Sequence, residues 1–93
     1  MAISKNIKNL SVLPNIGKTL AETLIKVGIT NAHELKETGS EKTILKIAAN
    51  KDSGACINML YALEGAIQGI RWHHLSNERK LDLKEFYRSM SMK

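Results

Sequence analysis

The residues best suited to chemistry lie near the start of the chain, within residues 13–24. Gly17 has no side chain, so the backbone beside it stays open to a ligand, and it can take the positive φ that a tight turn often needs. The free N–H groups of a helix that starts there form a natural site for a phosphate or another anion. Lys18 adds a positive charge and Thr19 a further donor. The segment therefore predicts an anion site that is held mainly by backbone groups.

A turn and a helix must position this site. Pro14 fixes its own φ and disfavours helix at Leu13, so we expect a tight turn over Asn15–Lys18. Apolar residues recur on one helical face from Gly17 to Val27, and Gly28 is expected to end that helix. A hairpin that opens into a helix, with a lysine at its mouth, is typical of one half of a helix-hairpin-helix phosphate clamp. Such a clamp binds nucleic acid without reading bases.

Two short helices are predicted next. The first covers Asn31–Thr38, with Thr30 as its N-cap. The second covers Glu41–Asn50, with Ser40 as its N-cap, and its buried face would consist of Ile44, Leu45, Ile47 and Ala48. The polar run over residues 51–54 predicts a turn.

The longest helix is expected from about Ala55 to Ile70. One face carries a bulky apolar stripe, made of Cys56, Leu60, Leu63, Ile67 and Ile70. A second face is small rather than polar, and it consists of Ala55, Ala62, Gly65, Ala66 and Gly69. A helix with two apolar faces should be packed on both sides. Interior glycines weaken a helix, so close approach of another helix is the favoured explanation for them, and a bend near Gly69 is the alternative.

A last helix is predicted from Ser76 or Asn77 to about Met90, with an inner face of Leu83, Phe86, Tyr87 and Met90. No strand-like alternation of useful length and no internal repeat is visible. We therefore predict an all-α fold, a single small domain over residues 1–93 with four to five helices. Its core would cover about residues 10–88, and residues 1–9 and 89–93 would be loose.

Composition limits the function classes only weakly. The net charge of +5 is compatible with nucleic acid, but the basic residues are scattered along the chain. Aromatic residues are only 4% of the chain, which argues against a single-strand binder that stacks bases. Cys56, the one cysteine, excludes an internal disulfide and fits a reducing cytosol, so a cytoplasmic location is expected. No run is apolar and long enough for a membrane span.

With its later landmarks added, the chain resembles the C-terminal domain of the TfoX family, bacterial regulators of natural competence. The resemblance runs from about Leu10 to Phe86. It rests on residues 13–18, Val27-Gly28-Ile29, Leu35 through Gly39, residues 63–67, Trp72 and Leu75. It implies a helix-hairpin-helix (SAM-like) domain with a role in transcriptional regulation of competence and no catalytic activity. The separate N-terminal domain that many such regulators carry is absent from these 93 residues.

Two functions remain open at this point. The first is a module that binds the phosphate backbone of duplex DNA through Asn15, Gly17, Lys18 and Thr19. The motif usually has glycine at the position of Asn15, whose side chain narrows access, so Asn15→Gly is expected to maintain or improve binding. The second is a protein-interaction module that docks a regulatory partner or itself. It would use the small face of the long helix and the methionine-bearing tail.

Enzymatic, metal and cofactor chemistry finds no support in the sequence. The sequence contains no recognisable nucleophile–base arrangement, no nucleotide-binding glycine loop and no pair of carboxylates typical of a hydrolytic site. His33, His73 and His74 could suggest a metal site, but surface positions are favoured. Trp72 is expected to close the end of the core.

Glu64 stands out as a carboxylate inside the apolar stretch of the long helix. Two interpretations are open. It lies at an exposed edge of that helix, which is favoured, or it is buried and held by Arg71 or a hairpin lysine.

Overall fold

The computed structural model describes residues 2–49 and 55–91, and all regular elements among them are helical. One 3₁₀-helix, η1 (Trp72–His74), lies before the last α-helix. The α-helices are α1 (Ala2–Ser11), α2 (Lys18–Lys26), α3 (Ala32–Thr38), α4 (Ser40–Ala49), α5 (Ile57–Gln68) and α6 (Asn77–Ser91). The all-α, single-domain prediction is confirmed. The described helices outnumber the four to five expected, because residues 2–11 form a helix that the sequence pattern had not predicted.

Some sequence predictions lie outside the described residues. These are the turn over residues 51–54, the helix end at Asn50 and the last part of the tail, residues 92–93. Within the described part of the chain, every helix is too short or too polar to cross a membrane.

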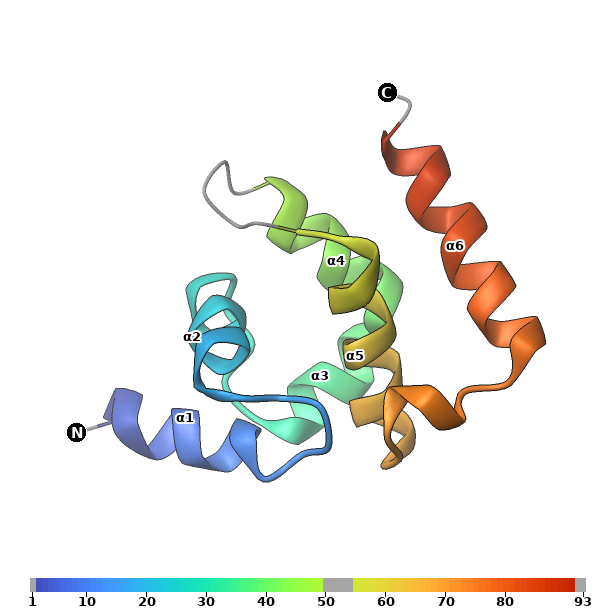
Figure 1. The fold of residues 1–93 in the computed structure, drawn as a ribbon. Helices are drawn as coiled ribbons and strands as arrows, with labels where there is room; N and C mark the ends of the chain where they lie inside the picture. The colour runs from blue at the N-terminus through green and yellow to red at the C-terminus, as the bar shows by residue number, and fades with distance from the viewer. Residues whose placement is uncertain (1, 50–54, 92–93) are drawn as a thin grey trace.

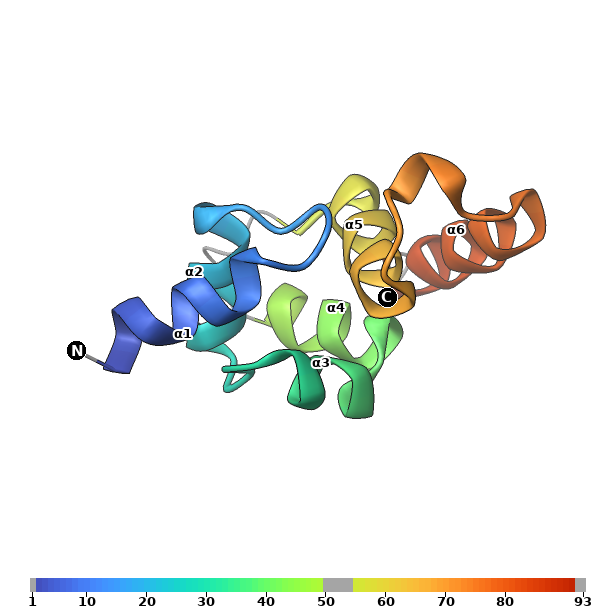
Figure 2. The same ribbon diagram turned by 90° about the horizontal axis from the view of Figure 1, so that it is seen from below.

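The helices form a compact body, with α5 in a central position (Figures 1 and 2). At one end, α1 and α2 pack against each other as a hairpin whose two helices cross at a steep angle, and α6 lies at the opposite end. α5 contacts α3, α4, η1 and α6, as predicted for a helix packed on two faces. Its Leu60, Leu63 and Ala66 are fully buried. The core around α5 thus lies between the α1–α2 hairpin and α6.

The buried face of α4 differs from the predicted one. Ile44 and Ile47 are fully buried, but Leu45 is 44% exposed and Ala48 also faces solvent. The helix instead turns Ser40 and Thr43 toward the interior. The buried positions 40, 43, 44 and 47 still follow the helical repeat. Compared with the predicted face, the observed one is rotated about the helix axis toward Ser40 and Thr43. A search for apolar residues alone could not detect this rotation, because both residues are polar.

The caps of α3 and α4 also differ from the expected ones. Asn31, rather than Thr30, caps α3, since its Oδ1 accepts a hydrogen bond from the backbone N–H of Glu34 at 2.9 Å. The Glu34 carboxylate in turn accepts from the backbone N–H of Thr30 at 2.8 Å, which completes a reciprocal cap. Ser40 does not cap α4 from outside. It lies within the helix, and its hydroxyl donates to a distant carboxylate, described below.

The two glycines near the C-terminal end of α5 have different roles. Gly69 ends the helix as a left-handed C-cap with φ of 76°, so it marks neither a close approach nor a bend. Gly65 is buried and does mark a close approach, but it is made by the side chain of Asn15 and by the backbone at Ile70 and Trp72 rather than by another α-helix. At the other end Cys56 is extended and exposed, so α5 is shorter than the predicted Ala55–Ile70. The inner face of α6 is as predicted: Leu83 is buried, and Phe86, Tyr87 and Met90 pack against the core.

Candidate anion site at the α1–α2 hairpin

The connection between α1 and α2 is a tight turn over Leu13–Ile16. The N–H of Ile16 donates to the carbonyl of Leu13 at 3.4 Å, with Pro14 and Asn15 in the two central positions. Asn15 has φ of 69°, and Pro followed by a residue of positive φ is typical of a type II turn. The turn therefore lies two residues before the predicted Asn15–Lys18. The positive φ belongs to Asn15 and not to Gly17, whose φ is −96°.

The turn leads into α2 as the sequence predicted. Gly17 is its N-cap, in extended backbone, and α2 ends at Lys26, just before Val27 and Gly28. The first backbone N–H that reaches a helical carbonyl is that of Ala21, which donates to Gly17 at 3.0 Å. The N–H groups before it have no intrahelical acceptor, and Gly17 has no side chain with which to cap them.

Gly17, Lys18 and Thr19 are exposed together at this helix start. A Cβ built on Gly17 would meet no atom within 4 Å, and its φ suits any residue, so neither packing nor backbone geometry requires glycine there. The first turn of α2 contains no acidic residue. Three of the four predicted site residues thus form an open, positively charged helix N-terminus.

Asn15 is turned away from these three residues. Its half-buried side chain crosses to the junction of α5 and η1, where Nδ2 donates to the carbonyl of Ile70 at 2.9 Å. A longer contact from Nδ2 reaches the carbonyl of Ala62 at 3.5 Å, and Oδ1 accepts from the N–H of Trp72 at 3.1 Å. The amide is therefore occupied by the protein's own backbone.

Trp72 lies where a residue closing the edge of the core should lie. It is half-buried and packs against the core cluster. Its ring stacks with Tyr61 at 6.0 Å and with His73 at 4.0 Å between ring centroids, and Lys80 Nζ lies 5.8 Å from the centroid of the indole ring. The indole ring of Trp72 is therefore used for packing against side chains of the same chain.

The histidines do not converge. His33 pairs with Glu37 of the same helix at 2.7 Å, and His73 is engaged with Trp72. Among the described residues, no three His, Cys, Asp or Glu side chains are arranged to hold a metal ion.

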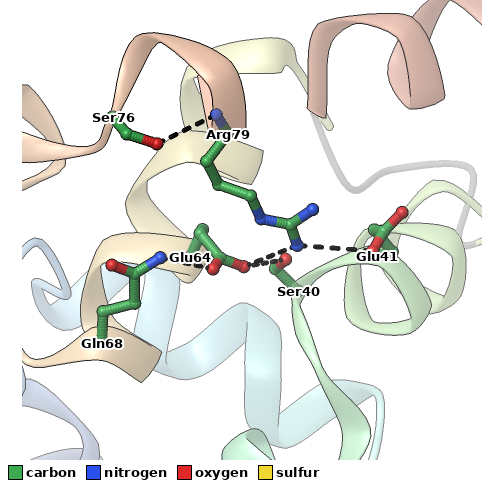
Figure 3. A network of polar contacts seen from close by, with 6 residues as sticks. All are labelled: Ser40, Glu41, Glu64, Gln68, Ser76 and Arg79. Carbon is green, nitrogen blue, oxygen red and sulfur yellow. Dashed lines mark hydrogen bonds and ion pairs between the residues drawn. The ribbon is translucent and has the colours of Figure 1, made fainter. Parts of the chain in front are cut away.

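Glu64 lies at the centre of a polar cluster whose members the sequence analysis did not name (Figure 3). The residue is only 8% exposed, so the favoured interpretation of an exposed edge was wrong and the alternative, a buried carboxylate, is confirmed. Its carboxylate accepts hydrogen bonds from Ser40 at 2.6 Å, from Gln68 at 2.7 Å and from Arg79 at 3.0 Å. The positively charged partner is therefore Arg79 of α6, and not Arg71, which is exposed. Glu64 lies four residues after Leu60 on the same face of α5, and this spacing could have indicated burial. No local pattern could name its partner, which lies on another helix.

The charge of Glu64 is stabilised by this cluster. Burial alone would raise the pKa of Glu64, but the hydrogen bonds from Arg79, Ser40 and Gln68 outweigh it and hold the pKa below the usual value. The hydrogen bond with Glu64 likewise raises the pKa of Arg79 above its usual value. The cluster is a structural ion pair, and it lies at the α4–α5–α6 junction rather than at the hairpin.

The comparisons agree with the resemblance seen in the sequence. The family model of the TfoX C-terminal domain matches residues 5–87. The chain is 33% identical over 76 residues to the DNA transformation protein TfoX of Haemophilus influenzae (strain ATCC 51907 / DSM 11121 / KW20 / Rd). That match covers 82% of this chain but 35% of the relative, so the chain spans about a third of the length of that protein.

Two crystal structures from Listeria monocytogenes are also similar. The first, of an uncharacterized protein in a triclinic form, is 54% identical with a TM-score of 0.86, over 89% of this chain and 93% of that chain. The second, of a protein of unknown function in a tetragonal form, is 55% identical with a TM-score of 0.84, over 88% and 99%. The family match over most of the chain, together with the order of its motifs and its helical fold, shows that the chain belongs to the TfoX C-terminal domain family.

Proposed function

We propose that this chain is a non-catalytic regulatory domain that holds the phosphate backbone of duplex DNA at the N-terminus of α2, in the regulation of competence or transcription. The observation that carries the proposal is the open start of this helix. Gly17 leaves the first N–H groups of α2 uncapped and exposed. Such groups are strong donors to phosphate oxygens. The name of the Haemophilus relative, a DNA transformation protein, supports a place in competence.

The charge at this end of α2 supports the same ligand. Lys18 is the first residue of α2, so it adds a positive charge to the positive end of the helix dipole. That placement weakens an isolated helix, because the charge and the dipole repel. A bound anion relieves the repulsion and gains attraction from both. Lys18 is therefore better explained by a negatively charged ligand than by helix stability.

The contacts available at the hairpin make this binding weak and insensitive to base sequence. The donors are backbone N–H groups, the Thr19 hydroxyl and one lysine, and contacts of this kind to phosphate carry no direct base information. One hairpin covers few phosphates. Useful affinity then requires a second hairpin, from another copy of the chain or from a tethered partner.

The test is a titration of the protein with several labelled duplexes at different salt concentrations, followed by fluorescence anisotropy. Wild-type protein should bind all duplexes with similar affinity, more weakly as salt increases. Lys18→Ala should weaken binding to every duplex and reduce the salt slope by about one unit. Lys84→Ala is the matched control, since Lys84 is exposed on α6 at the opposite end of the molecule (Figure 1). Absence of binding at low salt would overturn the proposal.

A substitution at Gly17 separates binding from stability. Serine fits there, because the position has N-cap geometry and free space. Its hydroxyl would cap the N–H groups of α2 and stabilise the fold by a few tenths of a kcal/mol, on the order of N-cap differences between glycine and serine. The same hydroxyl would occupy donors that a phosphate needs. Gly17→Ser should therefore unfold at higher urea concentration and yet bind DNA more weakly.

The alternative is a protein-interaction module, and part of the surface first considered for it is covered. Gly65 and Ala66, from the small face of α5, are buried within the chain. If wild-type protein fails to bind DNA, docking of a protein partner or self-association becomes the better proposal. Sedimentation of the chain over a range of concentrations then tests self-association first.

A further inference from the structure

We infer that Asn15 is a positioning residue, whose side-chain amide locks the hairpin onto the α5–η1 junction and so presents the open N-terminus of α2, and that Gly65 provides the space for that amide. The inference about the hairpin stands without DNA. Its consequence for DNA affinity rests on the proposed function.

The first support is the pairing of the amide. Nδ2 donates to the carbonyl of Ile70 and Oδ1 accepts from the N–H of Trp72, so the two bonds lie on either side of Arg71 in the chain. An amide that donates and accepts at once satisfies this backbone much as a neighbouring strand would. Aspartate has the same shape, but its ionised carboxylate cannot donate to Ile70. The arrangement therefore selects an amide and not merely a small polar residue.

The second support is the space at Gly65. A Cβ built on Gly65 would lie 2.5 Å from Asn15 Nδ2, 2.9 Å from the Ile70 carbonyl oxygen and 3.1 Å from the Cα of Trp72. Two of these three atoms belong to backbone and cannot move aside like the end of a flexible side chain. The missing side chain of Gly65 thus leaves room for the amide of Asn15, which lies 50 residues earlier in the sequence. The glycine lets the turn approach α5 closely enough for the amide to reach its partners.

The third support is the backbone of Asn15 itself. Its φ of 69° lies in the left-handed region, which glycine and asparagine adopt more readily than alanine. Glycine at this position would keep the turn and lose only the amide. Asn15→Gly therefore isolates the amide from the turn geometry. The expectation that this variant maintains or improves binding is replaced by the opposite one, because it releases the hairpin from its anchor.

The experiment is amide hydrogen exchange, measured by NMR for each residue in wild type, Asn15→Gly and Asn15→Asp at neutral pH. The N–H of Trp72 should lose protection by about tenfold in Asn15→Gly, as expected for a lost hydrogen bond in a half-buried site. Asn15→Asp keeps the shape and the acceptor for Trp72 but loses the donor to the Ile70 carbonyl, so the N–H of His74 in η1, which donates to Arg71, should also exchange faster. The N–H of Gly39, bonded to Leu35 elsewhere in the fold, is the internal control and should change much less than Trp72.

Three outcomes decide the inference. Selective loss of protection at Trp72 supports it. Unchanged protection at Trp72 in Asn15→Gly overturns it, and so does an equal loss at Trp72 and Gly39, which would indicate general destabilisation rather than a local anchor. DNA binding is measured separately, by the titration described above. If wild type binds duplex DNA, Asn15→Gly should bind more weakly, whereas failure of wild type to bind overturns the proposed function and leaves the exchange result to decide the role of Asn15.

Discussion

Arg79 of α6 donates a hydrogen bond to the carboxylate of Glu64 on α5 at 3.0 Å (Figure 3). The same nitrogen of Arg79 lies 3.4 Å from the carboxylate of Glu41 on α4, and Ser40 of α4 donates to Glu64 as well. One guanidinium on α6 therefore joins that helix to the two α-helices that precede it in the chain. Because α6 lies at the edge of the fold, this contact helps to fasten it to α4 and α5.

Removal of Arg79 should destabilise the protein more than removal of any exposed arginine. Arg79→Met keeps most of the apolar stem but leaves the buried carboxylate of Glu64 without its cation, which should cost about 1.5–3 kcal/mol of unfolding free energy. Arg71→Met is the matched control, because Arg71 is exposed, and it should cost little. Urea denaturation measures both. Equal stabilities for the two variants would contradict a structural role of the Glu64–Arg79 pair.

Stability should fall on acidification through the titration of Glu64. Its pKa is lower in the folded protein than the usual value of about 4.3 in an unfolded chain, so the unfolded state binds the proton more readily. The contribution of Glu64 is therefore complete above the unfolded pKa and is lost as the pH falls through the folded pKa. Unfolding free energies measured at several pH values should show this decrease. Glu64→Gln should have a shallower pH dependence, with a residual slope from Glu34, whose pKa is also lowered by its hydrogen bonds with Thr30.

Gly65→Ala should destabilise the protein, although an alanine inside a helix is normally more stable than a glycine by about 1 kcal/mol. The added Cβ would collide with Asn15 and with the backbone at Ile70 and Trp72. Overpacking of this kind costs about 1–3 kcal/mol. Part of the loss should disappear when Asn15→Gly is the background, since one of the three colliding atoms is then absent. A stabilised Gly65→Ala protein in urea denaturation would show that this contact is not tight.

Leu63 should be among the most sensitive positions of the core. It is completely buried on the central helix, so Leu63→Ala should lower the unfolding free energy by about 2–5 kcal/mol. Leu81 on α6 is 59% exposed, and the same substitution there should have a much smaller effect. Thermal or urea unfolding of the two variants provides the comparison. Similar losses at both positions would argue against α5 as the centre of the fold.

The sequence by itself determined the features that depend on neighbouring residues. Pro14 and Gly28 indicate a turn and the helix that follows it, although the turn lies two residues earlier than predicted. The apolar repeat of α6 predicts its inner face of Leu83, Phe86, Tyr87 and Met90. These features are local, since capping, turn chemistry and helical periodicity act over a few residues. The rotation of α4 was not predictable in this way. Its interior face includes Ser40 and Thr43, and only the packing of other helices makes polar residues suitable there.

Tertiary structure alone decided which distant groups meet. The amide of Asn15 reaches partners 55 and 57 residues away, and Glu64 finds its cation 15 residues away on the next α-helix. Local patterns showed that Asn15 departs from the usual motif and that Glu64 is unusual in an apolar helix. They could not name the partners of either residue, because a hydrogen bond between separate elements depends on how those elements are placed in space, and that placement results from the packing of the whole core.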